Sequence, residues 1–198
     1  MKTAGTSLEV HLAARCDRED IITKISPSNP AHVPRNFVDK NGRSYFNHMP
    51  ASLIRDFQPD AFASFFKFCF ERHPVDKCLS HFAMLKNSKH HADTGNPKTW
   101  TEYIEQGNFP VDTSKYVDEG PGLGTGKIIV DKIYRYEDFG EAIKDISVRT
   151  GIADGPVVGR EKSEFRYGVP SFDEVMAKPR DRARIFEAFE SSLKFTPY

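Results

Sequence analysis

The chain has 198 residues, enough for one domain with a substantial core. Its 28 basic and 28 acidic side chains give a formal net charge of zero, which argues against a general nucleic-acid binder, since such proteins carry a basic excess. No apolar run approaches the ~20 residues that span a bilayer, and Met1-Lys2 is followed by small polar residues, unlike a signal peptide. Three cysteines without metal-type spacing (Cys16, Cys69 and Cys78) predict reduced, structural thiols and a cytoplasmic protein.

Helical and β-rich segments alternate along the first half of the chain. Helices are predicted where apolar residues recur every three or four positions behind a capping residue or a proline, and strands where β-branched and aromatic residues run together. The predicted segments are a helix from Thr6 to Arg15, a strand at 21–25, a loop at 26–44, a short strand at 44–48, a short helix at 50–56, a strand buried on both faces at 64–70, and a helix from Pro74 to about Lys89.

The second half continues the alternation. The predicted segments are a short helix at 99–105, a long surface loop at 107–126, a strand at 128–136, a helix from Asp138 to Thr150 ended by Gly151, an irregular stretch at 153–170, and a charged helical end from Ser171. The alternation predicts an α/β fold of three layers, a mainly parallel sheet flanked by helices, in one domain covering residues 1–198.

The first motif is Lys2-Thr3-Ala4-Gly5-Thr6-Ser7, which opens a predicted helix. Ala4 and Gly5 are small enough to let the backbone approach an anion, and the helix that follows offers free N–H groups and the positive end of its dipole. Taken alone, so short a segment is unspecific, and an ordinary capped helix behind a disordered tail explains it more readily.

The second motif surrounds Arg72 and Ser80, which follow the predicted strand at 64–70. Ligands of open α/β sheets gather at the carboxyl ends of the strands, so Arg72 is placed to hold an anion and Ser80 to add a hydroxyl. The alternative is that Arg72 pairs with Glu71 or Asp76 and that Ser80 is simply a small helix residue.

Together the two motifs resemble the sulfotransferases that use 3′-phosphoadenosine 5′-phosphosulfate (PAPS), and above all the carbohydrate, heparan 2-O-sulfotransferase-like type. The resemblance covers most of residues 1–150, and residues 151–198 form an unrecognised helical tail. Two further segments are similar to the family: Phe46-Asn47-His48-Met49-Pro50, its histidine-bearing segment, and Ile133 to Phe139, its late Tyr-Glu-Asp element.

The resemblance implies a P-loop-like fold and a role for each motif. Lys2, Thr3, Ala4, Gly5, Thr6 and Ser7 would hold the 5′-phosphosulfate, with Lys2 stabilising the leaving group; Arg72 and Ser80 would hold the 3′-phosphate; His48 would be the general base. An imidazole suits that task because its pKa lies near ~6.5. The implied co-substrate is PAPS, with no metal, and the implied acceptor is a hydroxyl of a carbohydrate or glycoconjugate.

The chain departs from the family in one respect: the strand that precedes the phosphate loop in relatives is missing, and Met1 stands where they usually have proline. Two other hypotheses stay open. One is a small-molecule kinase of similar fold, although no Gly-Lys-Ser/Thr loop is present. The other is a catalytically inactive nucleotide-binding protein, suggested by the missing strand.

Other segments are expected to be structural. His81, His90, His91 and Asp93 lack zinc-site spacing. His73 is expected to be structural or exposed, and His32 is a weak candidate for the acceptor site. Gly120 to Lys127 fails the P-loop pattern and is interpreted as a flexible turn, while Trp100, Tyr103 and Tyr116 are expected in an aromatic core rather than against a sugar.

Overall fold

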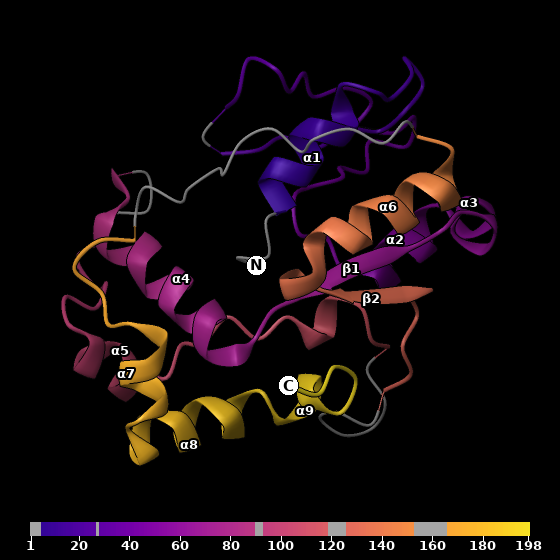
Figure 1. Cartoon of the computed structure of the whole chain (residues 1–198). Helices are drawn as coiled ribbons and strands as arrows, with labels where there is room; N and C mark the ends of the chain where they lie inside the picture. Colours follow the sequence, from indigo (N-terminus) through magenta and orange to yellow (C-terminus); the bar gives the residue numbers. More distant parts are fainter. Residues whose placement is uncertain (1–4, 27, 90–92, 119–125, 153–165) are drawn as a thin grey trace.

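The computed structural model describes residues 5–26, 28–89, 93–118, 126–152 and 166–198 (Figure 1). It is an α/β structure in which helices flank a small parallel sheet of two strands. In chain order the elements are α1 (Gly5–Ala13), α2 (Ala51–Phe57), α3 (Pro59–Ser64), β1 (Phe68–Glu71), α4 (Pro74–Asn87), α5 (Trp100–Gln106), the 3₁₀ turn η2 (Thr113–Lys115), β2 (Lys132–Arg135), the 3₁₀ turn η3 (Tyr136–Asp138), α6 (Phe139–Thr150), α7 (Phe172–Met176), α8 (Pro179–Ala188) and α9 (Glu190–Leu193).

The two strands lie side by side although they are far apart in the sequence. Phe68 pairs with Lys132 at one end of the register, and Glu71 pairs with Arg135 at the other. The connection between them contains α4 and α5, as the long crossover between parallel strands requires. Both strands therefore end at the same edge of the sheet.

One face of the sheet is covered by α1 and α6. Phe68 and Phe70 alternate with Cys69 along β1 and pack on this face with Tyr134 of β2. Leu8 of α1 joins the same apolar cluster, so α1 is anchored against the sheet.

A second apolar cluster lies beside the sheet and is built by helices. Val75, Leu79 and Phe82 recur at helical spacing on α4 and are buried against α5, α7 and α8. The C-terminal helices are thus part of the core: Val175 of α7 and Ile185 of α8 are fully buried.

Most of the predicted helices are confirmed. Those expected at 6–15, 50–56, 74–89, 99–105 and 138–150 and at the C-terminal end correspond to α1, α2, α4, α5, α6 and α7 to α9. Gly151 ends α6 as predicted, with a φ of 69° that a residue bearing a Cβ rarely adopts.

The predicted strands are mostly wrong in extent. Segment 21–25 makes only one isolated antiparallel bridge, between Ile22 and Arg35, and segment 44–48 only the bridge from Ser44 to Val38. The strands expected at 64–70 and 128–136 shrink to the four residues of β1 and β2, because β1 begins after the α3 helix and η3 follows β2 directly. Phe68, Cys69 and Phe70 are half-buried, so the expectation of burial on both faces was also wrong.

The expected surface loop at 107–126 is more ordered than predicted over the residues that are described. It contains η2, and Tyr116 and Val117 are buried, with Val117 bridged to Ile128. As for membranes, none of the helices in the described ranges has the length and apolar character needed to cross a bilayer.

Candidate functional site

Three helices begin where the two strands end (Figure 1). Pro74 opens α4 just after β1 ends at Glu71, and Phe139 opens α6 after β2 and η3. The Gly5 end of α1 lies toward the same edge, and Leu8 in its first turn packs in one cluster with Phe139. Helix N-termini carry free N–H groups and positive dipole ends, so their convergence favours an anion at this edge.

Arg72 lies at this edge, immediately after β1, and is only 8 % exposed. Its Nε donates to Asp76 Oδ2 at 2.5 Å, and its guanidinium stacks 4.3 Å from the ring of Tyr136. Arg166 donates to the other oxygen of Asp76, Oδ1, also at 2.5 Å. One carboxylate therefore holds two guanidinium groups beside each other, and the pairing of Arg72 with Asp76 that the sequence left open is what the structure contains.

Ser80 lies on α4 in line with this pair. Asp76 and Ser80 are four residues apart on the helix, so they occupy neighbouring positions on one face. Ser80 is half-buried, and it stands about 9 Å along the helix axis from Pro74, at 1.5 Å per residue. Arg72 therefore pairs with Asp76, and Ser80 follows Asp76 on the same face of α4.

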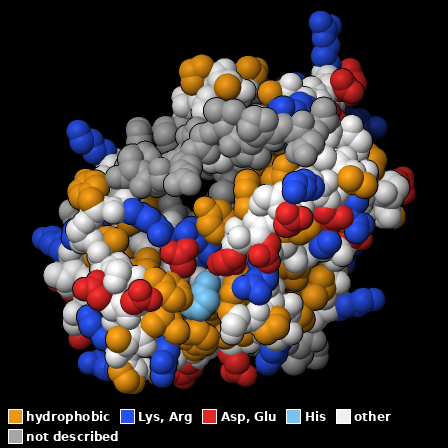
Figure 2. All heavy atoms as spheres, in the orientation of Figure 1, with side chains coloured by type: hydrophobic (Ala, Val, Ile, Leu, Met, Phe, Trp, Pro, Cys, Tyr) orange, Lys and Arg blue, Asp and Glu red, His pale blue; other side chains and the backbone are white. Residues whose placement is uncertain are grey.

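Charged side chains of both signs gather on this part of the surface. Figure 2 shows acidic and basic groups next to one another where α4 and α6 begin. Glu137 contributes to the acidic side, since its Oε1 accepts a hydrogen bond of 2.9 Å from the backbone N–H of His73. The first turn of α4 is thereby linked to the turn that opens α6.

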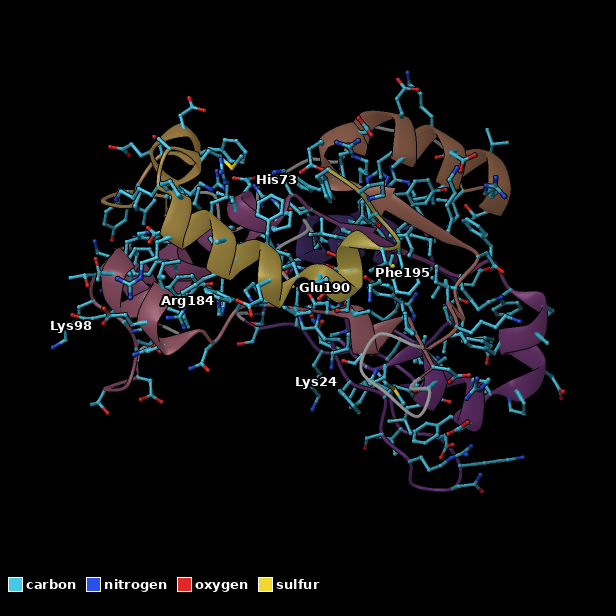
Figure 3. All side chains as sticks on the ribbon, turned by 90° about the horizontal axis from the view of Figure 1, so that it is seen from below. Lys24, His73, Lys98, Arg184, Glu190 and Phe195 are labelled. Carbon is cyan, nitrogen blue, oxygen red and sulfur yellow. The ribbon has the colours of Figure 1, made fainter. Side chains whose placement is uncertain are left out.

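His73 has a structural role at the start of α4. Its Nδ1 accepts the N–H of Val75 at 3.2 Å and so caps the helix. Figure 3 shows His73 beside α8, and its ring is enclosed by Phe172, Phe186 and Tyr198 at centroid distances of 4.8, 5.8 and 5.3 Å. Burial lowers the pKa of His73, and the carboxylates of Glu137 and Asp76 oppose that shift only in part.

This environment predicts a pH dependence of stability. The folded pKa of His73 lies below its value in the unfolded chain, so the unfolded chain takes up a proton first as the pH falls through about 6.5, and stability is lost there. Replacement by asparagine keeps a capping acceptor but removes the titration. Urea unfolding at pH values of about 7.5 and 5.5 should show a larger loss for the wild type than for His73→Asn; equal losses would exclude His73 as the source.

Behind Arg72, a buried ionic network fixes the end of β1. Lys77 is fully buried, and its Nζ lies 2.8 Å from Glu71 Oε2 and 3.0 Å from Asp112 Oδ2. Tyr116 donates its hydroxyl to Glu71 Oε1 at 2.9 Å. Burial, and then the charge of Glu71, raise the pKa of Tyr116 and keep it a hydrogen-bond donor. The network connects the end of β1 to α4 and to residues 112–116.

The predicted phosphate loop is described only in part. Lys2, Thr3 and Ala4 lie outside the described residues. Gly5 is exposed, Thr6 is half-buried and Ser7 is only 4 % exposed at the start of α1. Of the described part of the loop, Gly5 and Thr6 are the residues an anion at the edge would reach.

His48 is exposed in a turn closed by the hydrogen bond from Met49 N–H to Phe46 O. Its φ of 64° lies in the left-handed region, which is uncommon for a residue with a Cβ and often marks a functional turn. The side chain of Asn47, just before it, donates to Glu9 Oε2 at 3.5 Å. The turn bearing His48 is thus attached to the second turn of α1.

The carboxylate of Glu9 contacts side chains from three other segments and so joins them to α1. Besides Asn47 it accepts the hydroxyl of Thr23 at 3.0 Å, and His32 Nε2 lies 3.3 Å from its Oε1. The imidazole of His32 is fully buried next to the Glu9 carboxylate, so it does not line an open acceptor site.

The remaining candidates are structural or fall outside the described residues. His81 is buried, 3.1 Å from the Tyr103 hydroxyl, and Trp100, Tyr103 and Tyr116 are buried in the aromatic core as expected. His90, His91 and most of 120–127 lie outside the described residues. Over the ranges that are described, no group of three or more His, Cys, Asp or Glu side chains has metal-site geometry.

Sequence reasoning missed two features of this site. Arg166 is 90 residues from Asp76, so no local pattern indicates their contact. The fully buried Lys77 was missed because it is two residues from Val75 and one from Cys78, a spacing that places it on a different face of α4, where a lysine is normally expected in solvent.

In comparisons with known proteins, no protein-family model matches the chain, and no match was found among the curated proteins or the solved structures.

Proposed function

We propose that the chain is a PAPS-dependent sulfotransferase with a P-loop-like arrangement of its phosphate-binding helices. The observation that carries the proposal is the convergence of α1, α4 and α6 at the edge where Arg72 and Arg166 share Asp76. The proposal is supported by the described part of the first motif, Gly5 to Ser7, which opens α1, and by the second motif, which runs from Arg72 into α4.

In this proposal the nucleotide lies across the helix N-termini. Arg72, together with Arg166 and Ser80, receives the 3′-phosphate, because guanidinium groups form strong, charge-assisted hydrogen bonds to phosphate oxygens. The N-terminus of α1 receives the 5′-phosphosulfate through its N–H groups and Thr6. Lys2 has the role that the family resemblance implies, stabilising the bridging oxygen.

The proposed reaction is a single displacement at sulfur. The acceptor hydroxyl oxygen forms a bond to sulfur, the bond from sulfur to the bridging phosphate oxygen breaks, and the hydroxyl proton passes to His48. The products are a sulfate ester and 3′-phosphoadenosine 5′-phosphate (PAP). Catalysis then depends mainly on alignment and on stabilising the charge of the leaving group.

The binding test uses PAP, with ADP as the control that lacks the 3′-phosphate. Calorimetry should show tighter binding of PAP, and Arg72→Ala should weaken it about 10- to 100-fold, as expected for one charge-assisted contact. Arg184→Ala is the matched control, because Arg184 lies on α8 and donates to the Glu105 carbonyl at 3.4 Å, and it should leave binding unchanged.

Two results would count against the proposal. One is equal affinity for PAP and ADP, which would favour the kinase alternative. The other is unchanged PAP affinity in a correctly folded Arg72→Ala variant. Tight PAP binding without sulfate transfer to any acceptor would identify the inactive nucleotide-binding protein instead.

A further inference from the structure

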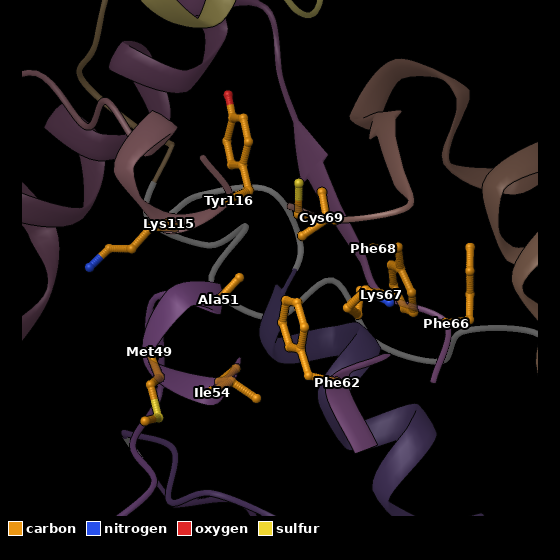
Figure 4. Close-up of a pocket in the computed structure, with 11 residues that line it drawn as sticks. Met49, Ala51, Ile54, Phe62, Phe66, Lys67, Phe68, Cys69, Lys115 and Tyr116 are labelled. Atoms are coloured by element: carbon orange, nitrogen blue, oxygen red, sulfur yellow. The ribbon is translucent and has the colours of Figure 1, made fainter. Parts of the chain in front are cut away.

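An apolar pocket of about 340 Å³ lies beside β1, in the size range of small-molecule sites (Figure 4). It lies between β1 and the helices α2 and α3. Lys115, Tyr116 and Val130 complete its lining. Its lining is dominated by aliphatic and aromatic side chains: Met49, Ala51, Ile54, Phe62, Phe66, Phe68, Cys69, Tyr116 and Val130, together with Lys67 and Lys115.

Two of the polar side chains that line the pocket are bonded to carboxylates outside its lining. The hydroxyl of Tyr116 is donated to Glu71, and the ammonium of Lys67 pairs with Asp131 at 2.9 Å. Figure 4 shows the ammonium of Lys115 directed away from the other lining residues. Burial raises the pKa of Cys69 to about 12, so its thiol is uncharged. The interior is therefore apolar and carries no net charge toward an occupant.

The pocket adjoins the residues proposed for transfer. Met49, one of its walls, directly follows His48. Cys69, another wall, lies on β1 three residues before Arg72, which directly follows the strand, and this corresponds to about 10 Å at 3.3 Å per residue. Tyr116 links the two places, since its ring lines the pocket while its hydroxyl reaches Glu71 beside Arg72.

We propose that this pocket binds the ring of a neutral, apolar alcohol, aromatic or alicyclic, and that such an alcohol is the sulfate acceptor. The acceptor part of this inference rests on the proposed function; the binding part does not. A sugar is a poor fit, because most of its hydroxyls would be desolvated against aliphatic and aromatic side chains. This replaces the carbohydrate acceptor that the family resemblance implies.

The binding part is tested without nucleotide, by calorimetric titration with 2-naphthol and, in parallel, N-acetylglucosamine. 2-Naphthol should bind and the sugar should not. Ala51→Phe and the more exposed Ile54→Phe both fill the pocket and should weaken naphthol binding at least tenfold. Val148→Phe is the control: Val148 is 84 % exposed on α6, and its variant should bind like the wild type. Absent naphthol binding, or binding that neither filling variant affects, overturns the proposal.

The acceptor part is tested by supplying PAPS and following release of PAP with each alcohol. Faster turnover with 2-naphthol than with N-acetylglucosamine, lost in the variant that fills the pocket and still folds, supports the assignment. Turnover with the sugar alone overturns it while leaving the sulfotransferase proposal intact. If PAP itself fails to bind, the sulfotransferase proposal fails, and the acceptor role fails with it. The ligand site is still established in that case if wild-type protein binds 2-naphthol and the variants that fill the pocket do not.

Discussion

His48→Asn should lower the rate of sulfuryl transfer roughly 10²- to 10⁴-fold, the range that a positioned general base contributes. Asparagine is chosen because it tolerates the left-handed backbone of this turn, where φ is 64°, better than alanine does. The loss should therefore come from the missing imidazole and not from a distorted turn. The measurement is PAP release under saturating PAPS and acceptor.

Two further readouts separate a base from a structural residue. PAP affinity should be the same in His48→Asn and the wild type, since His48 belongs to a different segment from Arg72. The wild-type rate should also fall toward acidic pH, where an imidazole base is protonated, and that limb of the profile should vanish in the variant. A full rate in His48→Asn would show that the base is another group.

The second large effect is expected on stability. Lys77→Met should lower the free energy of unfolding by about 3–5 kcal/mol, because it leaves the carboxylates of Glu71 and Asp112 buried without their cation. That is a large share of the 5–15 kcal/mol typical of folded domains. Urea denaturation monitored by circular dichroism measures the change.

The matched control is Lys144→Met, which removes an exposed ion pair with Glu141 on α6 and should cost less than about 0.5 kcal/mol. Adding Glu71→Gln to Lys77→Met should recover part of the loss, since a neutral amide oxygen still accepts the Tyr116 hydroxyl. A single Lys77→Met variant as stable as the control would mean that the network contributes no net stability.

The helices were predictable because their signals are local. Ser171 with Glu174 forms a capping box that starts α7, and Gly151 supplies the left-handed residue that ends α6. Strands carry weaker local signals, since a β-rich segment becomes a strand only if a partner pairs with it. Ile22 has a β-branched side chain that suits a strand, yet within the described ranges it pairs through a single bridge to Arg35.

The candidate site was predictable to the extent that its residues follow a strand directly. Arg72 lies directly after a strand, as the apolar run before it indicated. Its ion pair with Asp76 is local, because the two residues are four positions apart. The contact of Arg166 with Asp76 depends on how the C-terminal third folds back over α4, which no periodicity specifies. The pocket beside β1 likewise arises from segments around residues 50, 68, 116 and 130 that meet only in the folded chain.

The pairing of β1 with β2 has a consequence for the order of folding. Residues in register are 64 positions apart, as the pair Phe68 and Lys132 shows, and closing so long a loop is entropically costly compared with forming α4 or α6. The pairing that brings the starts of α4 and α6 to one edge is thus expected among the slowest events of folding. In a refolding experiment, recovery of anion binding should lag behind recovery of helical circular dichroism, so that ligand affinity reports the final assembly of the chain.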